Sequence, residues 1–253
     1  MSQPTPATLL CTAPYRPAAW VALIVGLCLA TAGCGGFAAQ GMNADGVQLF
    51  EQGQYQQAIE QFDRAIINDP NNADSYYNLA AVYHRLGTQN KSQSDLDQAE
   101  HYYNMCRDRD PNHRECYRGL AVLFVEQNRK DEAFQLIREW ADRNPVSPEP
   151  KVELARLYEE FGNRKAAKEH LLEALASDPT HTRALAALGK LREEMGDRAQ
   201  ALADYQRSLW HDRFQPEVAA RVAALQSALS PEPLVTLPET DTRTVTRDST
   251  PRR

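Results

Sequence analysis

The chain has 253 residues, a formal net charge of -6 and 42% apolar side chains, which is enough for one or two domains with a hydrophobic core. Such a mildly acidic chain is a poor candidate for binding nucleic acid, because that binding depends on Lys and Arg neutralising phosphates. The five cysteines are too few for a disulfide-packed small protein, and the scarcity of glycine beside many long-chain helix formers favours helices over sheets.

The first feature along the chain is an apolar segment at residues 18–32. Its length of roughly 15 residues is short for a membrane-spanning helix and matches the apolar region of a secretory leader. The segment ends in TAGCGG, which resembles a bacterial lipobox, in which small residues precede a lipid-bearing cysteine; Thr31 stands where an aliphatic residue is usual. The resemblance implies that residues 1–33 are a lipoprotein signal peptide that is cleaved off. It also implies that a lipid such as palmitate is attached at Cys34.

Two other interpretations of this segment remain open: an uncleaved anchor at residues 18–39, and ordinary cleavage after the small residues at 30–32. Acyl chains bind a bilayer through buried methylenes at about 0.8 kcal/mol each, so a multiply acylated cysteine needs no spanning helix. Gly35, rather than Asp, follows the cysteine, and by resemblance to enterobacterial sorting this implies the outer membrane. We therefore expect a lipid-anchored protein of the bacterial cell envelope, at the outer membrane and facing the periplasm.

An internal repeat of 34 residues occupies most of the remaining chain. The segment GQYQQAIEQFDRAIINDPNN at 53–72 recurs as GNRKAAKEHLLEALASDPTH at 162–181. In frames that start at residues 39, 73, 114, 148 and 182, position 8 is always Gly or Ala, position 20 is always Ala, and position 32 is Pro in all but the last. Position 24 is always a large residue, expected to fill the core beside the small ones: Phe62, Tyr103, Ile137, Leu171 and Tyr205. Small residues let two helices approach closely, and proline ends the second helix of each pair.

This pattern resembles the tetratricopeptide repeat (TPR), which implies an all-α fold, a right-handed α-solenoid of about five helix-turn-helix repeats. The expected organisation is a short tether at 34–38, repeats at 39–72, 73–113, 114–147, 148–181 and 182–215, a capping helix at 216–229 and a tail at 230–253. The capping helix would cover the apolar face of the last repeat, as solenoids require. The tail is rich in Pro, Thr and charged residues, and we expect it to be disordered.

Two repeats depart from the common frame. Repeat 2 has extra residues within GTQNKSQSDLDQ (87–98), between its two helices. We expect a polar surface loop there, with a loop that contacts a partner as the alternative. Trp140 stands at position 27 of repeat 3, where a small residue is usual, so it either fills the core or changes the angle of the joint with repeat 4.

No catalytic motif was found in the sequence, so we expect neither an enzyme nor a cofactor. Cys106, His113 and Cys116 are near one another, but the spacing C-x6-H-x2-C is not a familiar zinc pattern and no metal site is expected. The two cysteines belong to adjacent helices across the junction of repeats 2 and 3, where an oxidising periplasm would allow a disulfide. The alternative is two buried thiols that act as small hydrophobic side chains.

The TPR resemblance also implies a concave surface, lined by the first helix of each repeat, that binds protein or peptide partners. The positions that the family uses for this surface hold Tyr77, His84, Arg85, Arg118, Val122, Val125, Arg156 and Lys190. Their mixture of cationic and apolar side chains suits a peptide or helix with both charges and an apolar stripe. The alternative is that the charges only keep a solenoid in solution.

Together these features predict a non-catalytic protein-protein interaction scaffold, anchored by lipid, that assists the assembly of a multiprotein complex. Similar lipoproteins assist pilus secretin assembly or act as adaptors for cell-wall enzymes. A regulatory subunit of a membrane-bound enzyme is an alternative, and a cytoplasmic interaction module is a more distant one. We expect protein partners and a membrane but no nucleic acid, and the sequence does not determine the oligomeric state.

Overall fold

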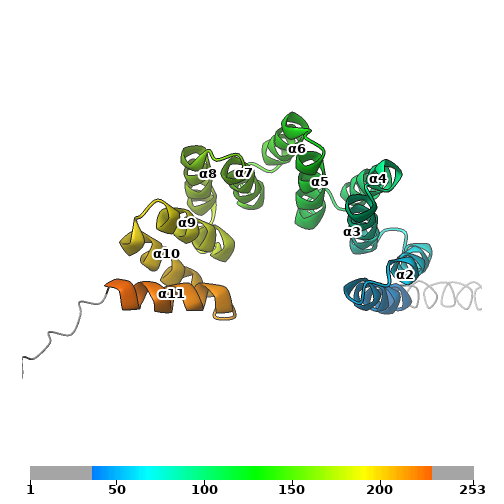
Figure 1. Cartoon of the computed structure of the whole chain (residues 1–253), viewed down its shortest axis with the longest axis horizontal. Helices are drawn as coiled ribbons and strands as arrows, with labels where there is room; N and C mark the ends of the chain where they lie inside the picture. The colour runs from blue at the N-terminus through cyan, green and yellow to red at the C-terminus, as the bar shows by residue number, and fades with distance from the viewer. Residues whose placement is uncertain (1–35, 230–253) are drawn as a thin grey trace, which may run out of the picture. The chain divides into compact units, whose positions relative to one another are not determined.

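The computed structural model describes residues 36–229, and this part of the chain consists of helices joined by short turns, without a β-strand (Figure 1). A first helix covers residues 36–51. The other helices are α2 (Tyr55–Asn68), α3 (Ala73–Asn90), α4 (Gln93–Arg109), α5 (Arg114–Glu126), α6 (Lys130–Arg143), α7 (Glu149–Glu160), α8 (Arg164–Ser177), α9 (Thr182–Glu194), α10 (Arg198–His211) and α11 (Pro216–Leu229). The described residues therefore have the all-α solenoid fold that the repeat predicts.

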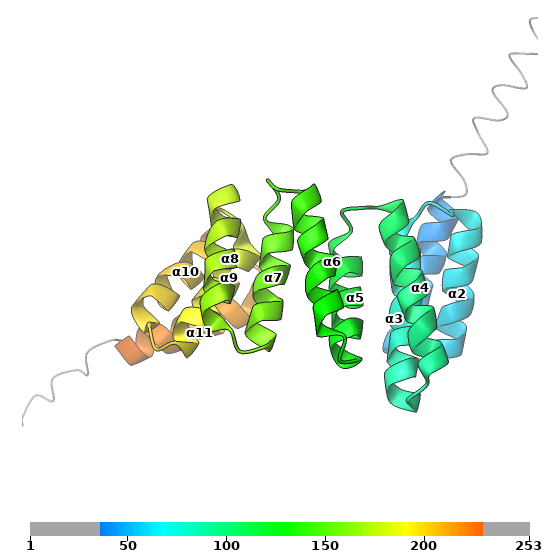
Figure 2. The ribbon, with the colours of Figure 1, turned by 90° about the horizontal axis from the view of Figure 1, so that it is seen from above.

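The helices form two compact units, one up to Leu157 and the other from Tyr158 onward. In the first unit α3 packs against α2 and α4, and α5 packs against α4 and α6, as Figure 2 shows for the neighbouring helices α3 and α4. In the second unit α9 packs against α8 and α10, and α10 packs against α11. Each unit is thus a stack of helical hairpins in which a helix touches its neighbours along the chain.

Three Asp-Pro steps end the second helices of their repeats, as the frame predicts. The backbone N–H of Asp69 donates to the carbonyl of Ala65, and Asp110 and Asp178 repeat this bond at the ends of α4 and α8. Each of the three aspartates also accepts a hydrogen bond from the backbone N–H two residues later, which closes the turn. The side chain at the next N-cap (Asn72, His113 or His181) then accepts from the N–H three residues on and starts the following helix.

The small residues at position 8 of the frame allow close contact with the large residue at position 24. A Cβ atom added to Gly46 would lie 2.5 Å from the Phe62 ring, and one added to Gly189 would lie 2.8 Å from the Tyr205 ring. Real Cβ atoms do not approach other atoms so closely, and Phe62 and Tyr205 are both buried. The pairing of small and large residues that defines the repeat in sequence is therefore a packing contact in the structure.

The prediction of a polar surface loop in repeat 2 is wrong. The extra residues lengthen α3 and α4 and leave only a tight turn between these helices. Lys91 makes this turn in a left-handed backbone conformation, and the Ser92 hydroxyl caps α4 by accepting from the N–H of Asp95. Gly87 lies against Leu96, since a Cβ atom there would be 2.5 Å from the leucine side chain. This contact joins the added turns of the two helices.

Several expectations concern the ends of the chain. The signal peptide at 1–33, Cys34 and the tail at 230–253 lie outside the described residues. Residues 36–38 of the expected tether are helical and continue into the first helix. Among the helices between residues 36 and 229, none is both long enough and apolar enough to cross a membrane.

Trp140 fills the core of repeat 3. Its side chain is 2% exposed and stacks on Tyr117 of α5, with ring centroids 4.3 Å apart and planes 3° from parallel. The Arg107 guanidinium lies 4.7 Å from the centroid of Tyr117, and Arg143 donates to the tyrosine hydroxyl at 3.0 Å. The large side chain at this position therefore packs within its own hairpin.

A disulfide joins Cys106 of α4 to Cys116 of α5 across the junction of repeats 2 and 3, and the two Cα atoms are 6.4 Å apart. Both cysteines are fully buried beside Tyr76. The bond crosses the junction at the place that the repeat frame indicates.

Candidate functional site

A hollow of about 330 Å³ lies in the first unit and collects three of the residues expected to bind a partner. We call it the α3 hollow, because α3 supplies most of its lining residues. Its lining consists of Phe50, Tyr77, Ala81, His84, Arg85, Thr88, Tyr103 and Glu126. Tyr77, His84 and Arg85 are the predicted members, whereas Phe50, Thr88 and Tyr103 were not expected to contribute.

A hydrogen-bonded chain of Tyr103, His84 and Glu126 runs through the α3 hollow. His84 Nε2 lies 2.9 Å from Glu126 Oε2 and His84 Nδ1 lies 3.3 Å from the Tyr103 hydroxyl. A carboxylate only accepts, so Nε2 carries the proton toward Glu126, and in the neutral ring Nδ1 accepts from the tyrosine. Thr88 Oγ1 also donates to Glu126 Oε2, at 3.2 Å. These bonds hold the carboxylate at the edge of the hollow, where it can accept from a partner.

Burial raises the pKa of Tyr103 well above its usual range, and the nearby Tyr77 and Glu126 add to this effect. Burial is also the main cause of the raised pKa of Tyr77, with Glu115 raising it further and Arg118 opposing the shift. Both tyrosines therefore remain neutral at any physiological pH. They offer the hollow aromatic surface and hydroxyl groups without a negative charge.

We expect the stability of the first unit to fall as the pH rises above about 10, the pKa of tyrosine in an unfolded chain. A raised pKa in the folded state means that the stabilising contribution of Tyr103 is complete below that pH and is lost as the pH approaches the folded-state pKa. For the Tyr103→Phe variant, the free energy of unfolding should fall less steeply with pH, by up to about 1.4 kcal/mol per pH unit. Urea unfolding between pH 8 and 11 measures this difference, and identical slopes for the two proteins would contradict it.

Two predicted cations near the hollow are available to a partner. Arg85 and Arg118 are exposed, and within residues 36–229 neither has an ion-pair partner. Arg85 lines the α3 hollow, and Arg118 on α5 is close enough to Tyr77 to influence its titration. Val122 and Val125 are half-buried on the same helix as Arg118. The first unit thus has exposed positive charge on α3 and α5, and α5 also carries these half-buried apolar side chains.

Arg156, a further predicted groove residue, makes an ion pair within the fold. It lies on α7, where its Nε donates to Glu153 Oε2 at 3.0 Å. Glu153 is fully buried, and the arginine side chain is 24% exposed. Removing one partner of a buried ion pair is costly because it leaves the other charge uncompensated. Arg156 therefore stabilises the fold.

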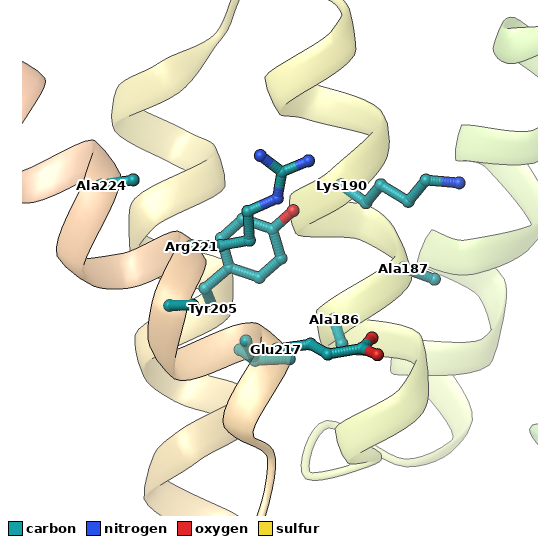
Figure 3. Close-up of a pocket in the computed structure, with 9 residues that line it drawn as sticks. Ala186, Ala187, Lys190, Tyr205, Glu217, Arg221 and Ala224 are labelled. Atoms are coloured by element: carbon teal, nitrogen blue, oxygen red, sulfur yellow. The ribbon is translucent and has the colours of Figure 1, made fainter.

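A second hollow, of about 690 Å³, lies in the second unit between α9 and α11 (Figure 3). Its apolar surface comes mainly from small side chains, and Lys190 is the predicted groove residue that it contains. The lining consists of Ala186, Ala187, Lys190, Tyr205, Glu217, Val218, Ala220, Arg221 and Ala224. The contribution of α11 was not predicted from the sequence, because this helix was expected only to cover the last repeat.

The two cations that line this second hollow, Lys190 and Arg221, are paired within the second unit. Lys190 Nζ lies 2.5 Å from Glu159 Oε1. The Tyr205 hydroxyl donates to Glu193 Oε2 at 3.1 Å, and Arg221 lies 3.6 Å from the same carboxylate group. A partner would therefore have to compete for Lys190, and this makes the α3 hollow the better candidate site.

Comparisons with known proteins identify the repeat. Family models described as TPR repeat or tetratricopeptide repeat match residues 46–87, 91–148 and 149–181. The chain belongs to the tetratricopeptide-repeat family. This family generally consists of protein-interaction scaffolds without catalytic activity, and the match supports that role for this TPR chain.

Comparison with solved structures also finds TPR proteins, of which the first named here is similar in fold. A thermophilic TPR protein from Thermus thermophilus is 24% identical to this chain, with a TM-score of 0.55. The match covers 75% of this chain and 100% of the Thermus chain. PilF of Pseudomonas aeruginosa is 17% identical, with a TM-score of 0.49 and coverage of 76% and 84%. YrrB, described as a TPR protein with an unusual peptide-binding site, is 14% identical, with a TM-score of 0.40 and coverage of 71% and 89%. No curated protein matches the sequence.

Proposed function

We propose that this TPR protein is a lipid-anchored scaffold of a bacterial cell envelope, which binds a protein partner at the α3 hollow and helps to assemble a multiprotein complex. A complex of the pilus-secretin type or one built around a cell-wall enzyme is the kind of assembly that the sequence resemblance suggests. The observation that carries the binding role is the pair of exposed arginines without ion-pair partners in the described chain, Arg85 and Arg118, beside aromatic surface.

The chemistry of the α3 hollow indicates what a partner segment should contain. Arg85 and Arg118 favour acidic side chains, because a guanidinium binds carboxylates through paired N–H groups. Phe50, Tyr77 and Ala81 line the hollow and favour an aliphatic or aromatic side chain between those acids. A short acidic segment with one or two large apolar residues satisfies both requirements.

The proposed anchor is lipid at Cys34, which the TAGCGG motif supports. The described part of the first helix starts at residue 36, two positions after this cysteine in the sequence. Attachment there would hold the first hairpin close to the membrane surface. Acyl chains supply the membrane affinity, since each buried methylene contributes about 0.8 kcal/mol.

Expression of the full chain in a Gram-negative host tests the anchor. We expect the intact mass of the membrane-bound product to correspond to a chain that begins at Cys34 and carries added acyl groups. The Cys34→Ala variant should keep its leader and lack the acyl mass, because the acceptor thiol is gone. An unprocessed and unacylated wild-type chain would refute the anchor and leave the binding role of the α3 hollow to be judged separately.

A further inference from the structure

We propose that Cys106, His113 and Cys116 form a zinc site when the two cysteines are reduced. The sulfur atoms and a ring nitrogen of the histidine all lie within 4.8 Å of one another. Both cysteines are fully buried, and the His113 side chain is 10% exposed. Zinc bonds of about 2.3 Å to sulfur and 2.0 Å to nitrogen place ligand atoms roughly 3.5 Å apart, so three donors gathered in this way can bind one ion.

The histidine is already oriented as a metal ligand. His113 Nε2 lies 2.8 Å from Asp74 Oδ1, and because the carboxylate accepts, Nε2 carries the proton. The lone pair is therefore on Nδ1, which lies 3.1 Å from Cys116 Sγ. A carboxylate that holds the outer nitrogen of a ligating histidine is the usual second partner in zinc sites, where it fixes the ring and its tautomer.

A fourth donor is near. Glu115 Oε2 lies 3.8 Å from His113 Nδ1, and the carboxylate of Glu115 also bonds to Arg114. Two thiolates, an imidazole and a carboxylate form a donor set that zinc accepts in tetrahedral sites. Thiolate ligands disfavour calcium and magnesium, which prefer oxygen, so the expected ion is a thiolate-binding cation such as Zn²⁺.

The disulfide and the zinc site are alternative states of the same cysteines. A dithiol or phosphine reductant supplies two electrons, two protons are taken up, and the bond between the sulfur atoms is replaced by two thiols. Zn²⁺ then displaces the two thiol protons and binds both thiolates. Zn²⁺ also binds the lone pair of His113 Nδ1. In the disulfide form this nitrogen accepts a hydrogen bond from the backbone N–H of Cys116 at 3.3 Å. An added disulfide reagent would accept two electrons from the thiolates, restore the bond between Cys106 and Cys116, and release the ion.

Either state ties α4 to the start of α5 beside the α3 hollow. The His113 ring centroid lies 5.7 Å from that of Tyr77, which lines the hollow. A chain that has not yet formed its disulfide could therefore hold this junction with zinc, and the inference does not depend on which partner the hollow binds. The spacing of Cys106, His113 and Cys116 in the sequence does not indicate this site. The three residues come together because the Asp-Pro turn after α4 places His113 opposite the end of that helix.

The test uses the full chain in detergent with Ser at Cys11, Cys28 and Cys34, so that the remaining cysteines are Cys106 and Cys116. Zn²⁺ is added without oxygen to the oxidised chain and to the phosphine-reduced chain, and binding is measured by competition with a chromophoric chelator. We expect the reduced chain to bind one equivalent of zinc that the oxidised chain does not bind. Equal binding by the two forms would overturn the proposal.

Two variants separate the proposed site from binding at other side chains. His113→Asn keeps an N-cap for α5 but removes the imidazole, and it should weaken zinc binding by at least about tenfold. Asp74→Asn should weaken it about 10- to 100-fold by removing the carboxylate that orients the ring. Circular dichroism checks that each variant is folded in the reduced state. Zinc affinity that is unchanged in a folded His113→Asn variant would also overturn the proposal.

Discussion

Replacing Trp140 with alanine is expected to lower the free energy of unfolding of the first unit by about 3–5 kcal/mol. The side chain is 2% exposed and stacks on Tyr117, so its loss removes a large buried apolar surface and leaves a cavity between α5 and α6. The helices around it cannot close this space, because Tyr117 is itself held by Arg143. Urea unfolding followed by circular dichroism measures the change in midpoint.

Trp210 provides a matched control, because its side chain is 78% exposed. The Trp210→Ala variant should change stability by less than about 0.5 kcal/mol, as exposed substitutions usually do. Trp140→Phe should lose less than Trp140→Ala, since a phenyl ring retains part of the stacking on Tyr117. Similar midpoints for Trp140→Ala and Trp210→Ala would show that Trp140 does not support the core of repeat 3.

The sequence predicts the helices well, because the residues that recur in the repeat are the ones through which the helices pack. The expected frames begin at Ala73, Arg114 and Thr182, and these are the first residues of α3, α5 and α9. A small residue at position 8 and a large one at position 24 touch in the structure, as Gly46 and Phe62 do. Five copies of one sequence pattern reinforce one another, and this is why the fold could be predicted without an alignment.

The extra residues of repeat 2 were harder to predict, because only one copy of the repeat contains them. Their polar composition indicates a loop, yet Leu96 supplies the apolar contact that the added helical turns need, and Gly87 makes room for it. Ser92 then caps α4. A single leucine in a polar segment is weak evidence for a helix, so the prediction failed at this point.

The candidate site depends on ion pairs and hydrogen bonds between side chains, which the repeat pattern does not predict. The family positions indicate which side chains face the concave surface, but they do not say which charges are already paired. Arg118 and Arg156 hold family surface positions on α5 and α7, yet Arg156 bonds to the buried Glu153. Tyr103 was expected only as a core residue at position 24, and its hydroxyl nevertheless reaches His84 in the α3 hollow. Such details depend on side-chain packing between repeats.

Reversing the charge of both Arg85 and Arg118 to Glu is expected to weaken partner binding by at least about 100-fold, which corresponds to about 2.7 kcal/mol. The change replaces two cations that have no ion-pair partner in the described part of the chain with anions that repel an acidic segment. Both positions are exposed, so helical content and the unfolding midpoint should not change. Crosslinking in membranes followed by quantitative pull-down gives the partner yield for each protein.

The control for this experiment is the reversal of Arg64 and Arg213, which changes the net charge of the chain by the same amount. Both are exposed, and neither lines the α3 hollow or the hollow between α9 and α11. Arg156→Glu would be a misleading control, because leaving Glu153 buried without its partner costs about 3 kcal/mol and disturbs the fold. If the Arg85 and Arg118 variant recovers as much partner as the Arg64 and Arg213 variant, Arg85 and Arg118 do not select the partner.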